Sequence, residues 1–270
     1  MPSFIFPPSF TAAHFERVVK QFVEPAWQEV AEAIYPVIIT SCRELPEAEC
    51  KMPIGAGRQR LESRRVLQVD GQWAGPGRGM ATVLLNPEVT RAILNRNACE
   101  AAPKIMGPIV EKVFRDYANV EVLTMPVRPR LVVQFPHDKD QGSYLHCVFK
   151  VTFRNSEVWF LDLTYTQFGF ESCWAPQREY RGLYQNWVFD KDQDFCRPLD
   201  ANYKMYGNLP ADDRQLNDLL RESLRAEFSR FRRERGKNIH QMVDNGQELR
   251  ALFRELRRCA DEVVADLAHG

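Results

Sequence analysis

The chain has 270 residues, 44% of them hydrophobic and 11% aromatic, which is enough to bury one large core. Lysine plus arginine and aspartate plus glutamate both total 36, so the global charge indicates no polyanionic partner and only local clusters could provide one. No apolar run is long enough to span a membrane, and no basic segment precedes the apolar N-terminus. We therefore expect a cytoplasmic protein without membrane contact, whose seven cysteines are reduced thiols and which needs no metal or cofactor.

The first forty residues predict a long helix. Apolar residues recur at helical spacing from Phe10 to Ile39, as in a helix that packs one face on a core. Residues 43–80 are polar and rich in glycine and proline. We expect an irregular stretch there, with one short strand from Arg65 to Val69.

Two further helical segments are predicted before residue 120. The pair Asn86-Pro87 is typical of an N-cap followed by the first helical residue, and predicts a helix to about residue 97. A second helical stretch covers Cys99 to Tyr117. Pro103 and Pro108 are expected to kink or divide it, because proline lacks the backbone N–H that a helix interior needs.

Four short segments rich in valine, phenylalanine and leucine follow, and they predict a mostly antiparallel sheet. They are VEVLTM at 120–125, RLVVQF at 130–135, LHCVFKVTF at 145–153 and VWFLDL at 158–163. The last sixty residues predict two helices, 212–235 and 244–268, separated by Gly236. We thus expect an α+β fold with a core in residues 1–200, containing helical residues 86–118 and strands across 120–165, and a helical hairpin in 201–270 packed on it.

One carboxylate lies within an apolar strand, and its position suggests chemistry. Asp162 interrupts the run WFLDL, and a buried charge is costly unless it is paired. His146 lies 16 residues earlier on the preceding strand, where an antiparallel neighbour can place it beside Asp162. Cys99 lies 47 residues before His146, near a helix start whose positive end lowers a thiol pKa. This order predicts a nucleophile, a base and a residue that orients the base.

These three segments resemble a known family. NACEAA (97–102), LHCVFKVTF (145–153) and FLDLTYTQFG (160–169) are similar to the transglutaminase-like branch of the papain-type cysteine enzymes, over about 75 residues. The resemblance implies a core of helices packed on an antiparallel sheet, a Cys-His-Asp triad on Cys99, His146 and Asp162, and a covalent thioester. Val148 stands where that family usually has an aromatic residue. The two prolines after Cys99 are a second departure, and Cys42 is therefore a competing nucleophile.

Supporting residues and structural alternatives surround this triad. The backbone N–H of Cys99 and the side-chain amide of Gln134 are candidates for an oxyanion hole, although an ordinary role at a strand end is favoured for Gln134. Thr164 and Gln167 are expected to fix the loop after Asp162. Each triad residue also has a structural interpretation, as an inert core thiol, a hydrogen-bonded core histidine and a turn-capping aspartate.

The C-terminal helices carry a basic cluster that could follow phosphate groups. Glutamates are interleaved with it, as on an ordinary solvated helix. The candidate contacts are Arg225, Arg230, Arg232, Arg233, Arg235 and Lys237. The sequence therefore predicts Cys-dependent acyl transfer between an acyl donor and an amine or water, as in an acyltransferase or amidohydrolase. One alternative is an enzyme that takes aminoacyl-tRNA as donor, resembling the cyclodipeptide synthases in general character. Another is a non-catalytic interaction module.

Overall fold

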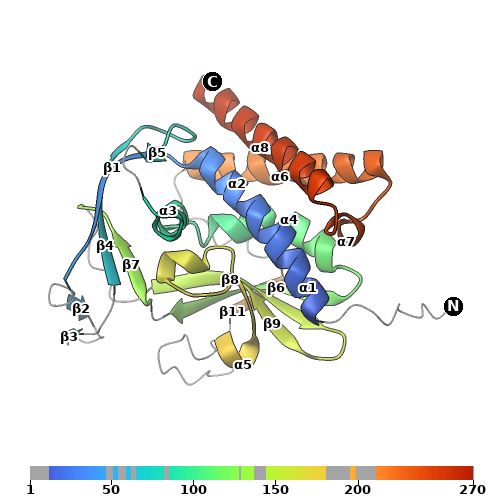
Figure 1. The fold of residues 1–270 in the computed structure, drawn as a ribbon, viewed down its shortest axis with the longest axis horizontal. Coiled ribbons are helices and arrows are strands. Elements are labelled where there is room, and N and C mark those ends of the chain that lie inside the picture. The colour runs from blue at the N-terminus through green and yellow to red at the C-terminus, as the bar shows by residue number, and fades with distance from the viewer. Residues whose placement is uncertain are drawn as a thin grey trace.

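The computed structural model describes residues 12–46, 51–53, 59–61, 65–81, 85–127, 129–136, 144–180, 195–198 and 211–269. It shows a mixed α+β fold in which helices cover one face of a five-stranded sheet (Figure 1). A smaller sheet of four strands lies at one end of the molecule. In the part of the chain that is described, no helix is long and apolar enough to cross a membrane.

The N-terminal segment forms a helix with one wide turn. α1 (Ala12–Val18) continues through a π-helical turn (Val19–Val23) into α2 (Glu24–Ile34). Pro25 follows that turn, and a π-helical turn accommodates the proline ring and its missing N–H. The helix ends at Ile34 and not at the predicted Ile39, because Pro36 forces Tyr35 into an extended conformation.

The four-stranded sheet has the order β5-β1-β4-β7. Its strands are β1 (Val37–Glu44), β4 (Arg65–Trp73), β5 (Met80–Ala81) and β7 (Leu131–Gln134). The short strand predicted at Arg65 is confirmed and is longer than expected. The stretch predicted as irregular also holds β2 (Lys51–Pro53) and β3 (Gln59–Leu61), while residues 47–50, 54–58 and 62–64 lie outside the described part. The prediction for β7 was wrong in its pairing, because β7 lies parallel to β4 and not in the sheet of β6, β8 and β9.

Two helices connect this sheet to the larger one. α3 (Pro87–Leu94) begins as predicted, with the Asn86 side chain accepting a hydrogen bond from the Val89 N–H at 2.8 Å. α4 (Ala101–Phe114) is a single helix, so the expected division at the prolines does not occur. Pro103 lies in the first turn, where a backbone N–H would have no intrahelical acceptor, so its absence costs no hydrogen bond. Pro108 lies within the helix. Most of α4 is buried, because it lies between the large sheet and α6.

The larger sheet has the order β10-β9-β8-β6-β11, and its neighbouring strands are antiparallel. The strands are β6 (Ala118–Val127), β8 (Tyr144–Phe153), β9 (Val158–Leu161), β10 (Trp174–Pro176) and β11 (Phe195–Pro198). A short 3-10 helix, Tyr165–Phe168, and α5 (Gln177–Tyr180) flank β10 in the chain. β9 pairs only with residues 149–152 of β8, so the beginning of β8, including position 146, extends beyond the end of β9.

The C-terminal residues form the outer layer. α6 (Ala211–Arg235) and α8 (Gly246–His269) are joined through α7 (Ile239–Met242), and α6 packs on α4 while α8 packs on α2. Gly236 ends α6 with a φ of 62°, as the predicted break requires. The apolar faces of both long helices share one hydrophobic core with α4 and the larger sheet.

Candidate functional site

Asp162 lies at the centre of a buried hydrogen-bond network directly after β9. Its backbone N–H donates to the carbonyl of Cys173 at 2.8 Å, which fixes the chain where the strand ends. Its side chain is inaccessible to solvent. Oδ2 accepts from Nε2–H of His146 at 2.7 Å and from the hydroxyl of Tyr180 at 2.5 Å. Oδ1 accepts from the backbone N–H of Thr164 at 3.0 Å. The three hydrogen bonds that the carboxylate accepts explain why a charge is tolerated in this apolar segment.

His146 is oriented by Asp162 and by an aromatic ring. The imidazole is fully buried, and the ring of Phe168 meets it edge-on with centroids 4.8 Å apart. Since Nε2 faces the carboxylate it carries the proton, which leaves a lone pair on Nδ1. Within the described residues Nδ1 is buried and has no hydrogen-bond partner. An imidazole in this state is arranged to accept a proton at Nδ1.

Cys99 lies against the strand that carries His146. Its sulfur is 3.8 Å from the carbonyl oxygen of Leu145, and the backbone of Cys147 also hydrogen-bonds to it. The thiol thus contacts both residues that flank His146 in β8. Burial raises the pKa of the Cys99 thiol, and the neighbouring Cys147 and Glu100 raise it further, with a smaller contribution from Asp162. The helix start was expected to lower this pKa, but the loss of hydration outweighs it.

The competing thiol and the proposed oxyanion donor lie in the other sheet. Cys42 is opposite Val69 in the β1–β4 pair, and burial raises the pKa of its thiol. The structure therefore brings Cys99, and not Cys42, next to the strand of His146. Gln134 ends β7 opposite Gln68 of β4. This position suits the strand-end role that was favoured for Gln134.

Thr164 and Gln167 connect the aspartate loop with the cysteine loop. The side-chain amide of Gln167 donates to the Thr164 hydroxyl oxygen at 2.8 Å, and its carbonyl oxygen accepts from the Asn97 N–H at 3.2 Å. Asn97 has a φ of 60° and precedes Cys99 by two residues. Both polar ends of Gln167 are therefore used in holding the two loops together, which suits a support role and not that of an oxyanion donor.

A second buried network steadies the same loops and was not anticipated. The indole N–H of Trp27 donates to Asn95 Oδ1 at 2.8 Å, and Asn95 Nδ2 donates to Thr166 Oγ1 at 2.9 Å. Asn95 is fully buried. These two hydrogen bonds link α2, the residues before Cys99 and the 3-10 helix after Asp162. In the sequence, the signal for this network is an asparagine near the end of a predicted helix, which does not reveal its partners.

Tyr180 was also missed as a member of the site. It ends α5, is 1% exposed, and packs its ring on Phe160 with centroids 5.0 Å apart. The segment QREY has no feature that marks it as a partner of Asp162. Its contact depends on where β10 places α5, which short-range patterns do not reveal.

The basic cluster of α6 is largely compensated by glutamates and aromatic rings. Arg230 contacts Glu227 and Glu234 at 2.6 Å and 2.7 Å, and Lys237 contacts Glu248 at 2.8 Å. Arg225 pairs with Glu222, while the guanidinium groups of Arg232 and Arg235 lie over Phe228 and Phe231. Arg233 shows no such contact within the described residues. This arrangement is that of a solvated helix with i,i+3 and i,i+4 pairs.

No protein-family model, no curated protein and no solved structure matches this chain.

Proposed function

We propose that this protein is an enzyme that transfers acyl groups through a thioester on Cys99. One observation carries the proposal: His146 is held by Asp162 through Nε2, while Nδ1 is buried and has no partner among the described residues, beside the strand residues that Cys99 contacts. Leaving a buried ring nitrogen unpaired is costly for a purely structural histidine. A base that takes a proton from a neighbouring thiol would explain why Nδ1 has no partner within the described residues.

The chemistry proceeds in two displacement steps. Nδ1 of His146 takes the thiol proton as the sulfur of Cys99 attacks the acyl carbon, and the carbonyl electron pair moves onto oxygen. The tetrahedral intermediate collapses, the leaving group takes the proton from Nδ1, and a thioester forms. An amine or water then attacks the thioester while His146 accepts its proton, and the thiol is restored. Asp162 keeps the imidazole in the required tautomer and stabilises its positive charge.

Three structural features support a transglutaminase-like core within this proposal. The cysteine precedes a long buried helix, α4, and that helix packs on the strand of the histidine. The aspartate directly follows the neighbouring antiparallel strand. α4 is also continuous, so the prolines no longer count against the resemblance.

A non-catalytic module is the second candidate, and the burial of Cys99 favours it. The residue is 9% exposed and its thiol pKa is raised, which are properties of an inert core thiol. In that case the histidine and the aspartate would be remnants of a site that no longer turns over.

Intact-mass spectrometry with p-nitrophenyl esters and aminoacyl-tRNAs as acyl donors separates the two candidates. We expect an acyl adduct on the wild-type protein that is absent in Cys99→Ala and kept in Cys42→Ala. In His146→Ala the rate of adduct formation should fall by about 10² or more. An adduct that persists in Cys99→Ala, or wild-type protein that gives no adduct with any donor, would reject the acyl-transfer proposal.

A further inference from the structure

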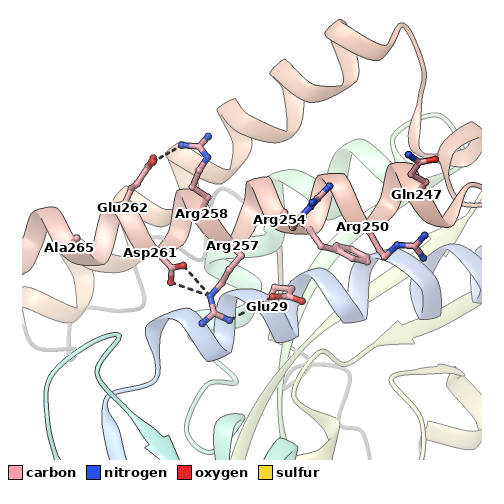
Figure 2. Close-up of a pocket in the computed structure, with 10 residues that line it drawn as sticks. Glu29, Gln247, Arg250, Arg254, Arg257, Arg258, Asp261, Glu262 and Ala265 are labelled. Carbon is pink, nitrogen blue, oxygen red and sulfur yellow. Dashed lines mark hydrogen bonds and ion pairs between the residues drawn. The ribbon is translucent and has the colours of Figure 1, made fainter.

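An open groove of about 730 Å³ runs along α8 and is bordered by Glu29 of α2 (Figure 2). It is formed by elements that do not contribute to the Cys-His-Asp constellation. The residues that line it are Glu29, Gln247, Arg250, Phe253, Arg254, Arg257, Arg258, Asp261, Glu262 and Ala265. Its volume falls in the range typical of sites for small ligands.

One end of the groove is rich in carboxylates that are already paired. Arg257 contacts Asp261 at 3.1 Å and Glu29 of α2 at 3.7 Å, as the dashed lines in Figure 2 show. Arg258 pairs with Glu262 at 2.5 Å. Among these lining residues three carboxylates face two guanidinium groups, so this end carries a net formal charge of −1.

The other end carries two arginines that pair with no carboxylate in the described part of the chain. Arg250 and Arg254 are exposed, and within the described residues neither forms a hydrogen bond or an ion pair. They are four residues apart on α8, so their side chains leave the same face of the helix about 6 Å apart along its axis. Gln247 lies on this face one turn earlier and adds an amide donor. This end therefore presents a local charge of +2 beside neutral hydrogen-bonding groups.

We propose that the groove binds a nucleoside diphosphate, with the diphosphate at Arg250 and Arg254. Guanidinium groups bind phosphate oxygens in pairs of parallel hydrogen bonds, and two adjacent groups match two linked phosphates. The sugar hydroxyls and the amino group of the base then lie toward Glu29 and Asp261, whose carboxylate oxygens accept hydrogen bonds.

The charge distribution selects a short ligand over a nucleic acid strand. A strand that entered at Arg250 and Arg254 would carry its next phosphates toward Glu29, Asp261 and Glu262. Like charges at such separations repel, and binding would lose the gain obtained at the arginine end. A ligand whose negative charge is confined to one end avoids this repulsion.

Isothermal titration calorimetry with ADP tests the inference, and its outcome is independent of the chemistry at Cys99. We expect ADP to bind, inorganic pyrophosphate to bind more weakly, and Arg250→Ala and Arg254→Ala each to raise the Kd for ADP about tenfold or more. Arg233→Ala is the matched control, because it removes an exposed arginine on α6 that also forms no pair within the described residues and lies outside the groove. The Kd of this variant for ADP should equal that of the wild type.

Three results would overturn the inference. The first is the absence of heat on titrating ADP into the wild-type protein. The second is an equal loss of affinity in Arg233→Ala, which would indicate nonspecific attraction to positive charge. The third is tighter binding of a single-stranded RNA oligonucleotide than of ADP, which would assign these arginines to a nucleic-acid surface. Circular dichroism spectra matching the wild type confirm that each variant is folded.

Discussion

The hydrogen bond from Tyr180 to Asp162 allows a prediction of how much one hydroxyl group contributes to the free energy of unfolding. Tyr180→Phe removes the hydroxyl that donates to Oδ2 at 2.5 Å and leaves the ring in its buried position against Phe160. The carboxylate then keeps the donors His146 and Thr164 but loses one charged hydrogen bond in a site without solvent.

The magnitude follows from the charge of the acceptor and from burial. Hydrogen bonds to charged groups stabilise proteins by about 1.5–3 kcal/mol, so we expect the free energy of unfolding to fall by that amount. For a chain of this size the corresponding decrease in Tm is about 3–12 °C. In an Asp162→Asn background the acceptor is neutral, and the same substitution should cost only about 0.5–1.5 kcal/mol.

Urea denaturation of the four proteins in this double-mutant cycle measures the effect. Tyr35→Phe serves as the control, because Tyr35 is also buried and its hydroxyl forms no hydrogen bond within the described residues. Burial raises the pKa of Tyr35, as expected for a desolvated phenol. If Tyr35→Phe and Tyr180→Phe reduce stability equally, or if the cost of Tyr180→Phe is unchanged in Asp162→Asn, the assignment of a charged hydrogen bond is wrong.

Three further predictions concern other parts of the fold. His240 Nε2–H donates to a backbone carbonyl at 3.0 Å, so Nδ1 of His240 accepts a hydrogen bond from His14 Nε2–H at 2.8 Å. Burial and the neighbouring His240 lower the pKa of His14 to about 4. The unfolded chain takes up a proton near 6.5 while the folded protein does not, so stability should fall as pH drops from 6.5 toward 4; urea midpoints that stay constant over this interval would contradict it. Asn95→Ala leaves the buried indole N–H of Trp27 without its acceptor and should cost about 2–4 kcal/mol in denaturant unfolding, whereas a cost below 1 kcal/mol would show that the network is dispensable. Gly169→Ala should destabilise the protein by about 2 kcal/mol or more, measured as a Tm decrease, because φ is 69° and the added Cβ would lie 2.8 Å from a β7 side chain; an unchanged Tm would refute this.

Local features of the sequence were sufficient to predict the structure at positions where a single physical requirement determines it. A charge in an apolar strand requires a partner, and antiparallel neighbours offer one at the right distance, so the pairing of His146 with Asp162 follows from local patterns. The same holds for Asn86, whose side chain caps the following helix as expected. The end of the first helix could also have been located, because Pro36 restricts the residue before it.

Features that depend on contacts between segments far apart in the sequence could not be predicted from local patterns. RLVVQF is a strand, but its apolar composition does not reveal that it lies parallel to β4, more than fifty residues earlier in the chain. Gln167 was expected to hold its own loop, yet it also fixes Asn97, seventy residues away. The α4 prolines were overestimated as helix breakers, since tertiary packing on both sides of α4 stabilises a helix that local preference disfavours.

If Cys99, His146 and Asp162 carry the proposed acyl transfer, their burial constrains how the reaction can proceed. In a site where hydration is lost and the pKa of the Cys99 thiol is raised, a separated thiolate and imidazolium are costly before substrate binds. In the proposed reaction, proton transfer to His146 would therefore accompany attack on the acyl carbon, so that negative charge develops on the carbonyl oxygen instead of persisting on sulfur. In the proposed reaction the substrate would approach past Leu145, because this residue is 63% exposed while its carbonyl oxygen contacts the Cys99 thiol. An exposed leucine next to a buried nucleophile suits an acyl group with an apolar side chain, because covering that surface contributes binding energy at the point where the reaction occurs.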